Sequence, residues 1–427
     1  SITSQQQNDL YLIAASAAVS GGSTAAGGTL NVTVADSNAK TIVKDGCVIK
    51  STGESVTISS LTEEQLISVL ASASASPTGS GTAGTISVLV SDSDTLTDIG
   101  ETKEIYAEKH VRIRADGSAK LFQINAALSA GAQNAVGATV SVNVLDRNIK
   151  ATVAPSQITA NTGDVEIGAT GDEMILLVLL AGGAAGANAL RGVIPVIVNN
   201  STILAEIEDG TEDNYTNISS GGKIAVKADA DSGIYLIAGG LSAAGANAMG
   251  ATINTAVVGN DIQANLGAFA RLASVYDVLV QAHATEDIVM VSIAAGLAGS
   301  NAVNGVINTL VVKNVVKATA REHVTITVEK KDDGGSEEAD PLPGVKVKAY
   351  DDTVLLNLAG SLSAAGSIGA GATVVTLVFN KEVTAETGAT DVITCPGKVE
   401  VLAHANDDLI LLAVAFGAGA STGVAGG

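Results

Sequence analysis

One 25-residue stretch, 234–258 (IYLIAGGLSAAGANAMGATINTAVV), recurs with variation along the whole chain. Each copy has an apolar run, then a block rich in Gly, Ala, Ser and Asn, then a run in which apolar and polar residues often alternate. The copies begin near residues 10, 66, 121, 174, 234, 288 and 354, and a half copy begins near 409. A period of about 53 to 66 residues is typical of an array whose units pack mainly on their neighbours. We therefore treat residues 1–427 as a single repeat array of about 7.5 units.

Composition limits how this array can pack and what it can bind. Apolar residues make up 46% of the 427 residues, but aromatic residues only 2%, and there is no Trp. The core must therefore be built from Ala, Val, Ile and Leu, whose small side chains allow thin layers. The net charge of −21 argues against a nucleic-acid partner, because phosphate binding requires a basic face.

The fourth unit shows which elements a repeat contains. Apolar residues alternate along 165–169, which predicts a half-buried strand. The run 174–180 is uniformly apolar, as in a strand covered on both sides. The glycine-rich stretch 182–192 allows the chain to reverse, and 193–198 returns as a strand. The pattern predicts an all-β fold, an elongated two-layered array of up-and-down strands, with a β-solenoid of coiled rungs as the alternative.

Polar steps interrupt both strands of each unit at equivalent places. Examples are 284–287 (ATED) and 405–408 (ANDD) on the outgoing strand, and 36–38 (DSN) and 146–148 (DRN) on the returning strand. Acid and amide side chains can satisfy backbone groups where a strand bends. Bends at one height would fold the array into two stacked sheets with an apolar interface and a polar outer face, about 10 Å apart.

The apolar runs are long enough to be compared with membrane helices. Residues 174–198 contain a single charge, Arg191. However, the middle of each run is dense in Gly, Asn, Ser or Thr, and the second half alternates with a period of two, as in 139–144. We therefore expect no membrane span.

Residues suited to catalysis or metal binding are few. Two of the four histidines, His283 and His404, occupy equivalent positions in the repeat, which indicates a structural role. The chain has no His-x-x-x-His or Cys-x-x-Cys spacing, and its glycine clusters lack the Lys-Ser/Thr of a phosphate loop. The acidic pairs 332–333 and 351–352 have side chains that could bind calcium, but we interpret them as solvated loop residues. We predict no enzymatic activity, no metal and no cofactor.

The two cysteines, Cys47 and Cys395, lie in equivalent loops six units apart. With two strands of each unit in one layer, six units would span about 58 Å. A disulfide requires Cα atoms within about 7 Å, so an internal bond is excluded unless the array closes on itself. Two free thiols or a bond between copies remain, and we predict the intermolecular disulfide.

Other features suggest an extracellular chain. A start at SITSQQQ without Met resembles a processed, mature form. Four of the Asn-x-Ser/Thr triplets in the chain are candidate glycosylation sites in a secreted protein. They begin at Asn31, Asn200, Asn214 and Asn217.

The last copy, 409–427, contains an apolar outgoing strand and only the start of a return. Its stretch 413–427 has no charged residue and no proline, the devices that normally protect a sheet edge. We therefore predict that a second copy of the chain adds here, head to tail, to make a ring or a filament. The residues of this polymerisation edge are Leu409, Leu411, Ala413 and Ala415.

Two resemblances to known families extend this interpretation. The run 137–152 (GATVSVNVLDRNIKAT), preceded by AGAQNA, resembles the repeats of large secreted bacterial adhesins and leukotoxins related to filamentous haemagglutinin. That resemblance implies an extracellular β-rich rod, although those proteins are usually far longer.

The second resemblance fits the chain length. A Gly/Ala/Val-rich, acidic, mature chain with two cysteines and arrayed β repeats is similar to the sheath protein of filamentous methanogenic archaea. That family implies stacked hoops of two-layered β-sheet around cells. The predicted function is self-assembly into an extracellular sheath or tube, with an adhesin stalk as the alternative.

Overall fold

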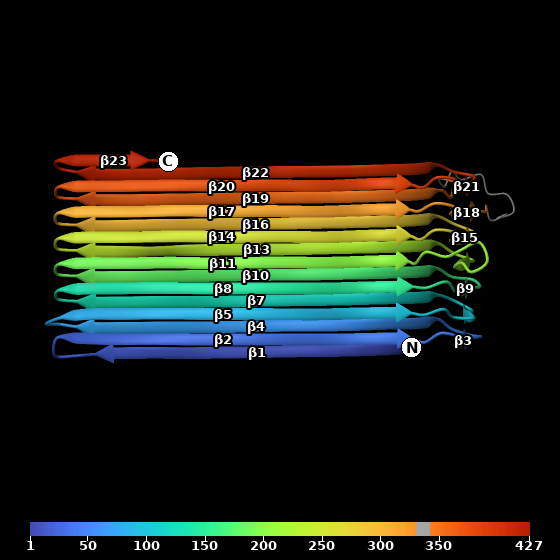
Figure 1. The fold of residues 1–427 in the computed structure, drawn as a ribbon, viewed down its shortest axis with the longest axis horizontal. Helices are drawn as coiled ribbons and strands as arrows, with labels where there is room; N and C mark the ends of the chain where they lie inside the picture. The colour runs from blue at the N-terminus through green and yellow to red at the C-terminus, as the bar shows by residue number, and fades with distance from the viewer. Residues whose placement is uncertain (330–341) are drawn as a thin grey trace.

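The computed structural model of this protein describes residues 1–329 and 342–427. The described chain is all-β and winds as a flattened coil through three parallel sheets. The long strands lie in layers, the short strands lie at one end of these layers, and the first and last coils lie at opposite ends of the stack (Figure 1). The predicted all-β, two-layered repeat array is confirmed, and its winding is that of the solenoid alternative.

Two long sheets face each other, and a third, short sheet lies along one side. Sheet A consists, in spatial order, of β1 (Ile2–Val19), β4 (Val56–Ser76), β7 (Val111–Gly131), β10 (Val165–Ala185), β13 (Ile224–Ala244), β16 (Val278–Ala298), β19 (Val345–Ala365) and β22 (Val399–Gly419). Sheet B consists of β2 (Thr24–Val43), β5 (Ser80–Ile99), β8 (Asn134–Val153), β11 (Asn188–Ile207), β14 (Asn247–Leu266), β17 (Asn301–Ala320), β20 (Ile368–Thr387) and β23 (Thr422–Gly426). Sheet C consists of β3 (Val48–Ser51), β6 (Glu104–Ala107), β9 (Gln157–Ala160), β12 (Asn217–Ser220), β15 (Arg271–Ser274), β18 (Thr325–Val328) and β21 (Val392–Thr394).

Each repeat unit forms one coil of the solenoid. The outgoing strand of a unit lies in sheet A and its return lies in sheet B, and each pairs in parallel with its counterparts in adjacent coils; β10, for example, lies between β7 and β13. The apolar residues near the start of each copy therefore form one column that points between the sheets. This column is Leu10, Leu66, Leu121, Ile175, Ile234, Ile288, Leu355 and Leu409.

The strands do not bend at the polar steps, so that expectation is wrong. β10 continues without interruption from Val165 to Ala185. Because its neighbours on both sides have the same length and register, each strand stays straight, and the polar step contributes side chains to both faces of the sheet. The expectation of one polar outer face is also wrong, because Leu241 on sheet A and Ile253 on sheet B are both exposed.

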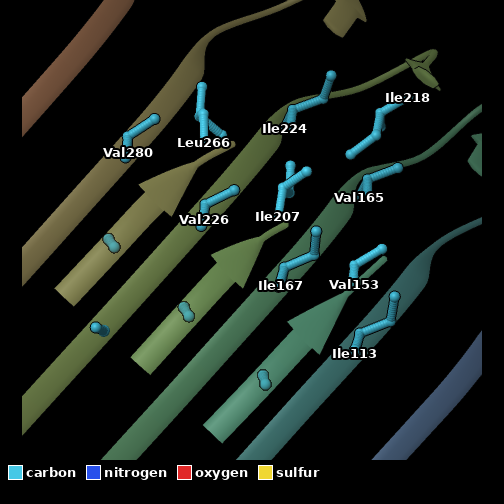
Figure 2. Close-up of a cluster of buried hydrophobic side chains, with 14 of the residues drawn as sticks. Ile113, Val153, Val165, Ile167, Ile207, Ile218, Ile224, Val226, Leu266 and Val280 are labelled. Carbon is cyan, nitrogen blue, oxygen red and sulfur yellow. The ribbon is translucent and has the colours of Figure 1, made fainter. Parts of the chain in front are cut away.

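The apolar core has two large parts and a third, small cluster. One part lies where sheets A and B meet sheet C, and Figure 2 shows Ile167 and Val226 of sheet A, Ile207 of sheet B and Ile218 of sheet C packed there. The other part lies between sheets A and B nearer the A-to-B turns, and includes Leu177. Both parts continue from coil to coil along the stack.

The two long sheets approach closely near the A-to-B turns. A Cβ added at Gly137 would lie 2.4 Å from the carbonyl oxygen of Gly182 on the facing sheet. Only a residue without a side chain fits at this distance. The abundance of Gly and Ala in the middle of each repeat thus permits the thin layers predicted from composition.

We predict that Ile167→Ala lowers the free energy of unfolding by about 2–5 kcal/mol, since it leaves a cavity in a fully buried part of the core. The matched control is Met174→Ala on the same strand, which removes a side chain from the outer face and should cost less than about 1 kcal/mol. Denaturant unfolding followed by far-UV circular dichroism measures both. Equal losses for the two variants would contradict the assignment of inner and outer faces.

Candidate functional site

A line of polar and charged side chains runs through the interior, between the two apolar parts of the core. We call it the polar seam. Sheet A contributes one register position, occupied in different coils by Glu64, Glu173, Glu286 and Asp407. Sheet B contributes the position occupied by Arg147, Asn260 and Lys381. These are the polar steps of the sequence, which the parallel register stacks at one height.

Lys381 organises the last coils of the seam. Its Nζ lies 2.6 Å from Asp351 Oδ1 and 2.8 Å from Asp407 Oδ1, and it also contacts Thr353. Glu286 Oε2 is 3.8 Å away. Burial alone would lower the pKa of Lys381, but hydrogen bonds to Asp351 and Asp407 raise it. The lysine is therefore charged and neutralises a cluster of acids in the interior.

Glu286 is almost completely buried beside this lysine. Asn260 Nδ2 donates a hydrogen bond to its Oε1 over 3.1 Å, and Thr353 Oγ1 donates to its Oε2 over 2.6 Å. Burial, with the nearby charge of Asp351, raises the pKa of Glu286 from 4.5 to about 8. The carboxyl group is therefore mainly protonated at neutral pH.

The seam continues toward the N-terminal coils with a different set of partners. Glu173 accepts a hydrogen bond from Asn199 Nδ2 over 2.7 Å, and its Oε1 lies 4.0 Å from the guanidinium of Arg147. Arg147 also donates to the carbonyl oxygen of Asp172 over 3.2 Å. In the second coil, burial raises the pKa of Glu64.

The seam holds the two sheets in register. Most of its groups are enclosed between the sheets, although Asp407 on the last strand of sheet A is exposed. Within the described ranges no three His, Cys, Asp or Glu side chains are placed to hold a metal ion. A buried, paired charge cluster disfavours any other alignment of the sheets, because a slipped strand would leave an unpaired buried charge. The sequence reasoning missed this role for the polar steps.

The sequence predicts that both acidic pairs are solvated loop residues. The pair 351–352 lies in β19, with Asp351 buried against Lys381 and Asp352 on the outer face, so the loop interpretation is wrong there. Successive side chains of a strand point to opposite faces of the sheet, and this alternation is the sequence signal that places Asp351 and Asp352 on different sides. The pair 332–333 lies outside the described residues, as does most of the charged insertion around it.

The two equivalent histidines do share a structural position. His283 and His404 lie in one outward column of sheet A, with Tyr350 between them. The ring centroids are 6.0 Å apart for His283 and Tyr350 and 6.2 Å apart for Tyr350 and His404, both edge-to-face. Edge-to-face contacts of this kind add a small stabilising term between neighbouring strands.

The cysteines lie at opposite ends of sheet C. Cys47 precedes β3 and Cys395 follows β21, and both are half-buried free thiols that pack against the apolar core. Because each sheet receives one strand per unit, six coils span about 29 Å rather than 58 Å. The distance still excludes an internal disulfide.

The candidate glycosylation sites differ in exposure. Asn200 and Asn214 are exposed. Asn217 is half-buried and donates from Nδ2 to Gln157 Oε1 over 2.9 Å. Asn31 faces inward, where it accepts a hydrogen bond from Thr33 Oγ1 over 3.2 Å and lies 3.5 Å from Ser68 of sheet A. Of the four, Asn200 and Asn214 present the most accessible side chains to a glycosylating enzyme.

The predicted polymerisation edge lies on β22, at the end of sheet A. Leu409, Leu411 and Ala413 are exposed and Ala415 is half-buried, whereas Leu355 and Ala359 at equivalent positions of β19 are buried. β22 pairs with β19 on one side. In the described part of the chain no strand of sheet A lies on its other side.

We predict that Lys381→Met lowers the free energy of unfolding by about 3–5 kcal/mol, because it leaves the buried Asp351 carboxylate without its partner. Asp351→Asn in the same chain should recover part of this loss. A double-mutant cycle by denaturant unfolding measures the coupling. Additive losses would show that the two side chains do not interact.

We also predict that stability falls as pH rises from about 5 to about 8 through Glu286. Its pKa is higher in the folded state than its ordinary value of 4.5, so its contribution is complete below 4.5 and is lost as pH approaches 8. One proton linked to folding gives a slope of about 1.4 kcal/mol per pH unit. Glu286→Gln cannot ionise, so its unfolding free energy should fall less steeply over this range. Parallel pH profiles for variant and wild type would contradict the assignment.

The described residues contain no helix that could cross a membrane.

Comparison with known proteins identifies no relative. No protein-family model, no curated protein and no solved structure matches this chain.

Proposed function

We propose that this protein is a structural subunit that assembles with copies of itself into an extracellular sheath or tube, by adding strands at the ends of sheet A. The observation that carries the proposal is the outer edge of β22, which is long, uncharged over 409–419 and, among the described residues, paired on one side only. An exposed edge of this kind is a template for another strand.

The direction of the backbone groups along β22 supports this reading. Val345 N–H of β19 donates to the carbonyl oxygen of Lys398 over 2.9 Å. In a parallel ladder the bonding direction alternates along the strand, so the N–H groups of odd-numbered β22 residues point away from β19. These include the four residues of the predicted polymerisation edge.

The first strand, β1, has the complementary free side. Within residues 1–329 and 342–427 it pairs with β4 alone, in the same register that every strand of sheet A follows. Addition of β1 from a second copy to β22 in this register would place Leu10 beside Leu409 and Leu12 beside Leu411, which extends the inward apolar columns. It would also place Asp9 beside Asp408, a like-charge pair that opposes addition at this position.

This junction cannot contain the predicted disulfide. Through the register of sheet C, Cys395 is equivalent to Ser51, four residues beyond Cys47. Even with β21 and β3 side by side, the two thiols would be offset by about 13 Å along the strand. An intermolecular disulfide therefore belongs to a contact other than strand addition, between copies packed side by side or stacked.

We predict that Leu411→Pro with Ala413→Pro slows elongation roughly tenfold, since two edge N–H donors are lost at about 0.5–1.5 kcal/mol each. Both prolines replace N–H groups that point away from β19, so the circular dichroism of the subunit should not change. Light scattering and negative-stain microscopy measure elongation.

Two further variants control this experiment. Ala413→Ser retains the edge N–H group and should elongate at the wild-type rate. Asp9→Asn removes the like-charge pair and should elongate faster. If the proline variant polymerises as well as wild type, strand addition at β22 does not build the polymer. A wild-type protein that remains a monomeric rod would favour the adhesin-stalk alternative.

A further inference from the structure

The outer face of sheet A carries a large uncharged surface in its half nearer the A-to-B turns. We call this surface the apolar field. It is formed by the outward side chains of 11–19, 67–75, 122–130, 176–184, 235–243, 289–297, 356–364 and 410–418. None of these outward residues is charged. Across eight strands and nine residues the field covers about 26 Å by 34 Å, or about 900 Å². Exposed patches on monomers are usually about 300–600 Å².

Two of the five rows of paired residues across the apolar field are corrugated with a period of two coils between β7 and β19. In one row, the large residues Leu128, Leu241 and Leu362 occur on every second strand, with small residues on the strands between them. Those small residues are Gly182 and Ala295.

In the row two residues earlier, large and small residues exchange strands. Leu180 and Ile293 are large residues on strands that carried small residues in the first row, whereas β22 carries large residues in both rows, Val414 and Phe416. Gly239 and Gly360 lie between them. The two rows together form a checkerboard of knobs and holes.

The knobs stand free and the hole at Gly360 is open, whereas the Leu128 side chain lies over part of the hole at Gly182. Leu128, Leu241 and Ile293 are each more than half exposed. A hollow of about 410 Å³ is lined by Leu128, Leu180, Leu241 and the two glycines Gly182 and Gly239. At Gly360 an added Cβ would meet no atom within 4 Å.

Such a checkerboard is complementary to itself. A second copy turned over about a two-fold axis parallel to the strands, and offset by one coil, places each large residue over a small one in both rows. Strands lie about 4.8 Å apart. A shift of one strand spacing along the stack is half of the two-coil period, and it brings the large residues of one copy over the small residues of the other. Two-fold contacts of this kind use the same patch on both partners.

We propose that the apolar field binds the apolar field of a second copy of this chain, sheet A against sheet A. The area of about 900 Å² on each partner matches the roughly 800 Å² per partner of stable interfaces. Interlocking knobs and holes allow the close packing that protein interiors require. This contact uses a face, not an edge, so it does not depend on strand addition and would double the thickness of any assembly.

The outer face of sheet B does not offer the same complementarity. Its corresponding row contains Ile86, Val140, Ile194, Ile253 and Ile307 on successive strands, all of them β-branched. The row two residues earlier, from Gly84 to Ala372, contains only Gly and Ala, so this face carries a ridge beside a groove rather than a checkerboard. The same two-fold contact would place ridge on ridge. The sheet B face is therefore the natural control surface, since it is also apolar near the A-to-B turns but lacks the checkerboard.

The test uses full-length protein and counts sheet layers in cross-sections by cryo-electron microscopy, with sedimentation to measure pair formation. Wild type should show four layers about 10 Å apart, two from each copy. The variant with both Leu241→Lys and Leu362→Lys should show two layers, and the affinity between two copies should fall at least tenfold. The matched control, Ile253→Lys with Ile307→Lys on sheet B, should keep four layers.

A second variant separates interlocking from simple apolar attraction. Gly360→Leu adds apolar area but fills a hole, so it should weaken pairing roughly tenfold although the surface becomes more hydrophobic. Circular dichroism establishes that each variant is folded. Pairing of Gly360→Leu at wild-type strength, or four layers in the sheet A lysine variant, would overturn the inference.

Experiments on wild-type protein alone distinguish the face contact from binding to a lipid surface and from the strand addition of the proposed function. Two-layer particles that float with phosphatidylcholine vesicles would identify a lipid surface as the occupant and overturn the inference. Elongated particles with two layers would also overturn it while leaving strand addition intact. Four-layer particles that do not elongate would support the face contact and refute the proposed function.

Discussion

Parallel pairing in a constant register is the constraint on which the rest of this structure depends. Each strand of sheets A and B lies beside its counterpart from the next unit, so a residue position becomes a column that runs along the stack. Because side chains alternate between faces, a slip of one residue would expose the inward column that contains Ile175 and Ile234. Apolar columns therefore hold the coils together, and equivalent residues of the units lie at the same position along their strands.

The polar seam adds specificity to this apolar packing. A column of leucine and isoleucine tolerates a slip of two residues, since the same face would still be buried. Lys381 and Asp351 do not tolerate it, because a slip would separate a buried ion pair. Arg191 is a further buried cation, whose pKa burial lowers to about 10, and Gly250 on the neighbouring strand leaves room for its side chain. Charges inside the solenoid thus define alignment more than they add stability.

Charge on the surface is segregated from the apolar surfaces. Ion pairs such as Arg112–Glu166 and Lys348–Glu400 link neighbouring coils on the half of sheet A next to sheet C. Exposed pairs contribute little stability individually, but they keep that half hydrated. The other half presents uncharged faces, and β22 presents a long edge. This division suits a subunit with solvent on one side and other copies on the remaining surfaces.

Repetition and alternation in the sequence were sufficient to predict the class of fold, because both are properties of single strands. The repeats place Leu10, Leu66 and Leu409 at equivalent positions of different copies, and the scarcity of aromatic residues predicts a thin core. Which strands become neighbours depends on contacts between units, and those only the tertiary structure decided. Parallel stacking turned the polar steps into a seam instead of bends, buried Asp351 while leaving Asp352 outside, and turned scattered glycines and leucines into a checkerboard. Each of these features requires two or more coils in register, since a column exists only where equivalent residues from distant parts of the chain lie side by side.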